Sequence, residues 1–437
     1  MRKKIKIKSI IIDEKEILVE TIYNKEGGVK FYLNDDLQYY FKDILFSKNT
    51  YFLPILKIRT IKNEIWTLFN CFYTYRFFIN GQPYIHLIYN MIVMSGVERK
   101  NFQCNRLRVK LKNFASIPIS NLLPNNLSFT YDNYRINTKI KLQYCNIIIK
   151  SNNFSNYDDL YTQFTYLFEL LNFIYGYFFS IEKITVYCDK KKIVVETETV
   201  HKYISSKMYI NKGLHFLKLD VNKNFKTIFI NYINFRKIAH YQLDLFFEST
   251  MENNKYNELN VVKILQIFDG IFANLQQFSN DLYIYPKELN DEIINYIDNI
   301  DFNDLNQKYQ VNTNINDKIK QCIYSMYKVN YREKIKHIFE TNNEIIFKAE
   351  KNEKLGHLKF TELVNKSTNS RNMVSHADEK SNYLTSTESL VYIYKFVLTF
   401  RLLIFNEIGL SKYIDSDKLE EVIEKLDAYI EKNLKNK

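Results

Sequence analysis

The chain has 437 residues, of which 46% are apolar and 16% aromatic, and it carries a formal net charge of +12. This apolar content excludes a mainly disordered protein, and the length is enough for two or three domains, each with its own core. The basic balance favours a polyanionic partner such as RNA, because surface cations gain by releasing condensed counterions, although AT-rich codons would also enrich lysine.

Residues 1–120 have the pattern of β-strands. Residues 4–8 alternate charged and apolar side chains with a period of two, and residues 65–73 and 87–94 are rich in β-branched and aromatic side chains. Asn80-Gly81 is typical of a tight hairpin turn. We therefore expect a β-rich domain over 1–120, sandwich-like or an open barrel.

Residues 121–250 indicate a mixed α/β continuation of this region. Residues 158–180 place apolar side chains at helical spacing, with Asp158 available as N-cap, and two strands, 184–188 and 192–200, follow. The many aromatic residues of this segment are expected in the core rather than in a base-stacking platform.

Residues 251–437 have a helical pattern. One apolar stripe runs from Val261 to Leu275, a second from Ile319 to Met326 and a third along 386–405, and an amphipathic helix at 419–434 follows. The expected fold class is therefore α+β, with a β-rich N-terminal region followed by an all-α helical bundle.

The cysteines and the apolar runs indicate the compartment. Five cysteines, widely spaced and without a C-x-x-C pair, argue against a disulfide framework and a zinc site. The apolar run after the basic residues 1–4 is too short for a signal peptide, and the longest one, Tyr166 to Ile181, is too short for a membrane span. We expect a soluble cytoplasmic protein without a membrane partner.

The segment Arg371-Asn372-Met373-Val374-Ser375-His376 sets a permanent cation and a titratable imidazole five positions apart. Arginine can bind a phosphate through two parallel hydrogen bonds, while histidine titrates near neutrality and can take or give a proton. Transfer of a phosphodiester to a neighbouring 2′-hydroxyl needs both properties. The segment therefore predicts cleavage of RNA that uses no metal and no cofactor.

The same spacing recurs at Arg332 and His337, inside a charged helical stretch where a solvated face explains the polar residues. Arg371 differs because apolar residues precede it and the helical pattern ends abruptly after His376. On a straight helix, five residues at about 100° each place Arg371 and His376 about 140° apart. Their convergence requires either a helix that breaks near His376 or a second copy of the chain.

The pattern Arg371-Asn372-x-x-x-His376, followed by a polar loop and a long helix that ends at 406–410, resembles the HEPN superfamily of ribonucleases. Residues 66–71 and the strand that reaches Ser95-Gly96 are similar to the β-rich N-terminal domain of ApeA-type HEPN proteins, which act in bacterial abortive-infection defence against phage.

This resemblance implies an endoribonuclease in which Arg371 binds the scissile phosphate, His376 handles the proton and Asn372 orients the site. It also implies cellular RNA as substrate, with tRNA among the candidates, a phage protein as trigger, and an active cleft between two copies in a homodimer or higher oligomer. Related chains often carry a glutamate on the first helix of this domain, where this chain offers Asp269 or no equivalent.

A HEPN-like module that binds RNA or senses a phage product without catalysis is the alternative, in which Arg371 only bridges helices. A hydrolase triad of Ser375, His376 and Asp378 is disfavoured, because near neighbours do not adopt triad geometry and no G-x-S-x-G motif occurs.

Other polar patterns have ordinary explanations. Asp298, Asp301 and Asp304 recur every three residues, which is more typical of a solvated helix face than of a cation site. Five histidines show no visible partners in the sequence and are expected to be ordinary surface or core residues: His86, His201, His215, His240 and His357.

Overall fold

The computed structural model describes residues 7–434, apart from 13–14, 20, 23–28, 33–50, 76–83, 94–101, 114–126, 142–143, 176–178, 189–190, 198–216, 218–223, 252–257, 303–307, 309–314, 343 and 377–381. The chain divides into two compact units. The first comprises Met1–Lys212 and Val221–Lys226, and the second comprises Gly213–Asp220 and Thr227–Lys437.

The first unit contains an antiparallel sheet of 13 strands in the order β2-β1-β5-β6-β7-β13-β12-β8-β11-β10-β9, with β4 joining β3 to β7. The described strands are β1 (Ile7–Ile12), β2 (Lys15–Leu18), β3 (Thr21–Ile22), β4 (Val29–Tyr32), β5 (Tyr51–Thr60), β6 (Ile65–Tyr75), β7 (Tyr84–Val93), β8 (Gln103–Asn113), β9 (Ser128–Tyr131), β10 (Tyr134–Lys141), β11 (Tyr144–Asn156), β12 (Phe179–Cys188) and β13 (Lys191–Thr197). All of them join one hydrogen-bonded sheet. The Asn80-Gly81 turn lies outside the described residues, and the antiparallel pair β6–β7 that flanks it is present.

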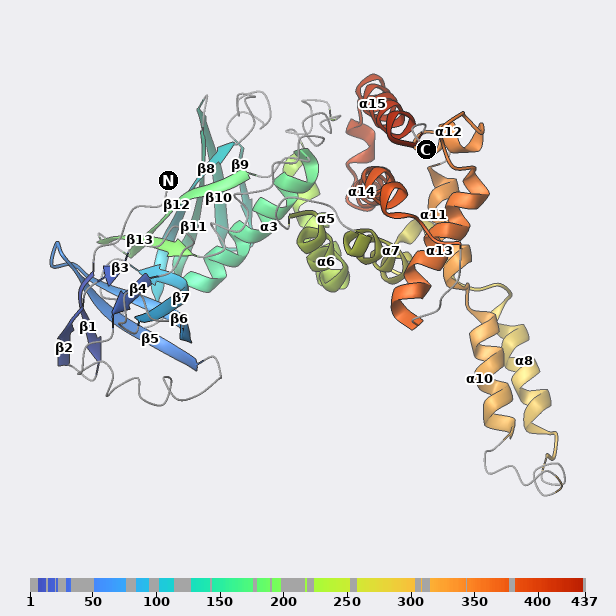
Figure 1. Ribbon diagram of the computed structural model, residues 1–437, viewed down its shortest axis with the longest axis horizontal. Helices are drawn as coiled ribbons and strands as arrows, with labels where there is room; N and C mark the ends of the chain where they lie inside the picture. Colours follow the sequence, from blue (N-terminus) through green and yellow to red (C-terminus); the bar gives the residue numbers. More distant parts are fainter. Residues whose placement is uncertain are drawn as a thin grey trace. The chain divides into compact units, whose positions relative to one another are not determined.

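One face of the sheet packs against α3 (Tyr157–Tyr175), which contacts β8 and β11 (Figure 1). Leu160, Phe164 and Leu167 of the helix are buried, as are Leu107 and Val109 of β8. The period of two along β8 thus separates an inner apolar face from an outer polar face. The aromatic side chains of α3 lie in this core, as expected.

The second unit is helical. Its described helices are α5 (Phe225–Ile238, whose first two residues belong to the first unit), α6 (His240–Met251), α7 (Glu258–Phe272), η4 (Gln276–Asp281), α8 (Lys287–Asp298), α10 (Ile315–Tyr327), α11 (Tyr331–Thr341), α12 (Lys348–Lys351), α13 (Phe360–His376), α14 (Ser386–Glu407), η5 (Ser411–Tyr413) and α15 (Ser416–Leu434). The stripes expected on α7 and α14 form the core, where the ring of Phe268 has centroid distances of 6.1 Å to Phe339 and 6.4 Å to both Phe396 and Phe400.

The α+β class, with strands first and helices after, is confirmed. The second unit includes Thr227 onward and so contains most of α5 and all of α6. Asn231 of α5 donates to the carbonyl of Ile408 at 3.2 Å, and the ring centroids of Phe246 of α6 and Phe400 of α14 are 4.5 Å apart. In the part of the chain that the structure describes, none of the helices is long and apolar enough to cross a membrane.

Candidate functional site

Three helices of the second unit bring charged side chains together around Asp269. Asp269 lies on α7, Lys334 on α11 and Arg371 on α13, and these helices pack against one another (Figure 1). Arg371 Nη2 donates to Oδ2 of Asp269 at 3.0 Å, and Lys334 Nζ donates to Oδ1 at 2.7 Å. The three side chains are 23–25% exposed, so this cluster is reachable from solvent. Two cations and one carboxylate leave it with one excess positive charge.

Tyr331 supports the guanidinium of Arg371. The guanidinium carbon lies 4.9 Å from the centre of the Tyr331 ring, within the range of cation–π attraction. The Tyr331 hydroxyl donates to the carbonyl of Leu265 at 3.2 Å. Burial, reinforced by the Asp269 carboxylate, raises the pKa of Tyr331 well above its ordinary value. Tyr331 is therefore a neutral support near neutral pH.

The guanidinium of Arg371 retains donors for a ligand. It carries five N–H groups, and apart from the bond to Asp269 the structure records one other, from Nη1 to Oδ1 of Asn372 at 3.3 Å. Its Nε is buried and has no hydrogen-bond acceptor among the described residues. Arg371 is thus held in place while keeping capacity for an anion.

The described part of α13 runs to His376. The side chains of 373–376, and residues 377–381, lie outside the described part of the chain. The structure therefore places Arg371 and Asn372 with their partners, while the pairing of Arg371 with His376 and the three catalytic roles stay predictions.

The chain on both sides of 377–381 is tied to α13. Asn369 donates to the carbonyl of Asn382 at 2.8 Å, and the hydroxyl of Ser370 accepts from the Leu384 N–H at 2.9 Å. One turn earlier, Lys366 pairs with Glu388 of α14 at 2.8 Å. These bonds fix the end of α13 against the start of α14.

The second Arg-x4-His match lies on α11. Arg332 has a side chain that is 52% exposed and donates to Asn365 Oδ1 at 2.9 Å, and the His337 ring centroid is 6.1 Å from that of Phe272. Arg332 is therefore solvated, as the sequence predicts. Lys334, from the same stretch, instead donates to Asp269. The expectation of a wholly solvated face was therefore wrong for Lys334.

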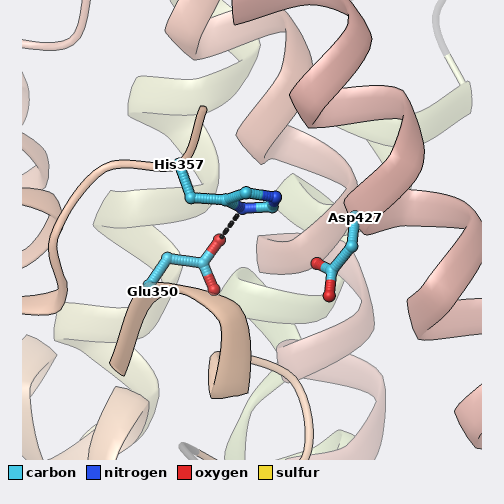
Figure 2. A group of neighbouring side chains, drawn as sticks. All are labelled: Glu350, His357 and Asp427. Carbon is cyan, nitrogen blue, oxygen red and sulfur yellow. Dashed lines mark hydrogen bonds and ion pairs between the residues drawn. The ribbon is translucent and has the colours of Figure 1, made fainter. Parts of the chain in front are cut away.

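A second charged cluster lies inside the helical unit and was missed in the sequence. Glu350 of α12, His357 after it and Asp427 of α15 place ligand-type atoms within 4.8 Å of one another (Figure 2). His357 Nδ1 is 2.9 Å from Glu350 Oε1, and both side chains are fully buried. The expectation that His357 is an ordinary histidine overlooked this partner.

Lys395 of α14 decides what this cluster can hold. Its Nζ is 2.6 and 2.7 Å from the two carboxylate oxygens of Glu350 and 2.7 Å from Oδ1 of Asp427. A divalent cation at this place would have to displace that ammonium. The donor set therefore fits an internal ion-pair network better than a metal centre.

The charge state of Glu350 follows from these partners. Burial alone would raise the pKa of Glu350, but the hydrogen bond with His357 and the positive charge of Lys395 outweigh it and hold that pKa below its ordinary value. The sequence did contain a signal for this cluster. Lys395 is one of two cations, with Arg401, inside the apolar run 386–405, and a buried cation requires a buried partner.

Residues 259–413 match the family model described as Apea-like HEPN, a range that runs from α7 to η5 and includes Asp269, Lys334 and Arg371. No curated protein and no solved structure matches the chain.

Proposed function

Because the helical unit of this chain contains an Apea-like HEPN domain, we propose that the protein is a metal-independent endoribonuclease of anti-phage defence. It cleaves cellular RNA, with tRNA among the candidate substrates, when a phage product triggers it. The observation that carries this proposal is the guanidinium of Arg371, which is oriented by Asp269 and Tyr331, partly exposed and still able to donate to an anion.

In the proposed reaction, the 2′-hydroxyl oxygen attacks the adjacent phosphorus and the bond to the 5′-oxygen breaks. His376 takes the proton of the 2′-hydroxyl or gives a proton to the leaving 5′-oxygen, a contribution of about 10²–10⁴-fold. Arg371 stabilises the charge that grows on the phosphorane oxygens, and Asn372 orients the guanidinium. The products carry 2′,3′-cyclic phosphate and 5′-hydroxyl ends, and DNA is inert because it lacks the 2′-hydroxyl.

Asp269 and Lys334 complete this site in different ways. Asp269 is a positioning residue, because it accepts from Arg371 and contacts no reacting atom in this mechanism. Lys334 shares the same carboxylate and adds a second cation beside the guanidinium. The excess positive charge of the cluster attracts the phosphate before the chemistry begins.

The decisive experiment is cleavage of total RNA and of tRNA by the purified chain with EDTA present. Arg371→Ala and His376→Ala should each abolish cleavage without unfolding the chain. Arg332→Ala and His337→Ala are the matched controls, since they remove the same residue types at the same spacing on α11, and they should cleave like the wild type.

Cleavage that survives His376→Ala, or that disappears with EDTA, would overturn the mechanism. RNA binding without cleavage under any condition would instead favour the non-catalytic module.

We also propose that two helical units pair so that their Arg371 segments face each other. The angle of about 140° between Arg371 and His376 on one helix makes a site shared by two copies the simpler arrangement. Light scattering should show a homodimer or a higher oligomer. A monomer at every micromolar concentration tested, with and without RNA, would contradict this.

A further inference from the structure

The outer face of the sheet in the first unit concentrates positive charge. The four neighbouring strands β12, β8, β11 and β10 contain nine lysines and arginines but only one carboxylate, Glu182. The whole chain has 61 such cations and 49 carboxylates. These four strands therefore carry eight excess positive charges, which is two thirds of the net charge of +12 of the whole chain. A codon bias that enriches lysine everywhere would not place it so unevenly.

The cations lie opposite one another on the face that points away from α3. Along β8, Leu107 and Val109 point inward and are buried, whereas Arg106 and Lys110 are half-buried and Arg108 is exposed. The register continues this row across the strands, because Arg106 pairs with Lys150 of β11, and Lys150 pairs with Arg135 of β10. Lys150 and Arg135 are exposed.

Aromatic and amide side chains are interleaved with these cations. The guanidinium carbon of Arg106 lies 3.6 Å from the centre of the Tyr187 ring, and Lys110 Nζ lies 4.3 Å from the centre of the Tyr144 ring. Arg108 donates to Asn146 at 3.0 Å. The long basic side chains are therefore held on the sheet by uncharged partners, and Lys110 alone of these three is also recorded in an ion pair, with Glu182 at 2.8 Å.

An open hollow of about 580 Å³ adjoins the Arg106–Tyr187 pair. The residues that line it combine cations, aromatic rings and amides: Asn105, Arg106, Lys150, Asn152, Phe154 and Tyr187. Phe154 is half exposed at this site. Rings stack with bases, guanidinium and ammonium groups bind phosphates, and amides bind base edges and hydroxyls.

We propose that this outer face, defined by Arg106, Arg108, Lys150, Arg135 and Tyr187, is a binding site for single-stranded RNA. An extended strand lays its phosphates along the cations and stacks a base in the hollow beside Tyr187. An acidic protein surface would satisfy the cations, but it would not use the ring and the amides in the hollow. The inference rests on the proposed nuclease only in the choice of RNA as the polyanion.

The test is the affinity of the full chain for a fluorescent single-stranded RNA, measured by anisotropy. His376→Ala serves as the background, so that the probe is not cut. Two triple variants, which change the charge equally, are compared. The first variant reverses the charge of three cations on the outer face, with Arg106→Glu, Arg108→Glu and Lys150→Glu. The second variant reverses the charge of three exposed lysines elsewhere in the same unit, with Lys8→Glu, Lys15→Glu and Lys62→Glu.

The face variant should bind at least about tenfold more weakly, and the slope of log affinity against log salt should fall by about 2, because each phosphate contact of a single strand contributes about 0.7. The control triple should change the affinity by less than about twofold. A further variant, Tyr187→Ala, leaves the charge unchanged and should weaken binding by about fivefold or more.

Wild-type affinity in the face variant, an equal loss in both triples, or no RNA binding by the background chain would overturn the proposal. The last result would favour an acidic protein as partner. Melting curves and circular dichroism show whether each variant is folded, and if the triple does not fold, Tyr187→Ala decides. Failure of the proposed nuclease function is distinguishable from failure of this proposal. In that case the wild-type chain does not cleave RNA, but RNA binding is still measurable.

Discussion

The helical unit contains two clusters with the same chemistry and different access to water. At Asp269 a carboxylate lies between Arg371 and Lys334, and all three side chains are partly exposed. At Glu350 a carboxylate lies between His357 and Lys395, and all three are fully buried. Composition alone would give both clusters the same function. Only the exposed one offers its cation to a ligand, so solvent access separates a candidate site from a structural one.

The largest effect on stability should come from breaking the buried cluster. Lys395→Met leaves the Glu350 and Asp427 carboxylates without their cation, and the loss of one partner from a buried ion pair costs about 3–5 kcal/mol. We expect urea unfolding of the helical unit to show a loss of this size. The control is Lys425→Met, which removes an exposed pair with Glu421 and should cost at most about 0.5 kcal/mol.

A variant that removes the charges of Lys395, Glu350 and Asp427 together tests whether an unpaired buried charge causes the loss of stability. The triple variant Lys395→Met, Glu350→Gln and Asp427→Asn removes the charges together and should recover much of the lost stability, because no uncompensated charge remains. Equal stability losses in Lys395→Met and Lys425→Met would contradict the structural assignment.

A smaller effect, on the reaction instead of on the fold, is expected at the exposed cluster. Asp269→Asn weakens the bond that orients Arg371, and hydrogen bonds to charged groups are worth about 1.5–3 kcal/mol, which corresponds to a fall of about ten- to a hundredfold in the cleavage rate. The fall should appear in kcat more than in KM, and Asp269→Glu should restore part of it. Single-turnover cleavage measures both.

The control for Asp269 is Asp244→Asn, since Asp244 of α6 also pairs with an arginine, Arg236, which is not Arg371. It should leave cleavage unchanged. If Asp269→Asn behaves in the same way as this control, Asp269 does not position Arg371 for catalysis.

Local spacing revealed most of the fold. The apolar stripes of α7 and α14 repeat with the helical period, so both helices were found from the sequence. The helix α5 was missed although Phe225, Ile228 and Phe229 follow helical spacing, because its aromatic and β-branched residues resemble a strand. Strand order was out of reach, since β7 reaches β12 through β13, a pairing between segments far apart in the chain.

The candidate site was only partly visible for the same reason. Arg371 and His376 share one segment, so their spacing could be read directly. Asp269 and Lys334 are 65 residues apart, and only the packing of α7 against α11 brings them together. A lysine in a charged stretch gives no sign of which neighbour it will meet. Lys395, which lies inside the apolar run 386–405, was the more informative cation.

The bonds between α13 and α14 have a consequence for how substitutions near the arginine can act. Asn382, Leu384 and Glu388 are each bonded to a residue of α13 that lies before Arg371. The part of α13 that precedes Arg371 is therefore tied to the start of α14 by bonds that involve none of residues 377–381. Substitutions at 377–381 thus remove none of these three bonds, and the backbone that carries Arg371 keeps its attachment to α14.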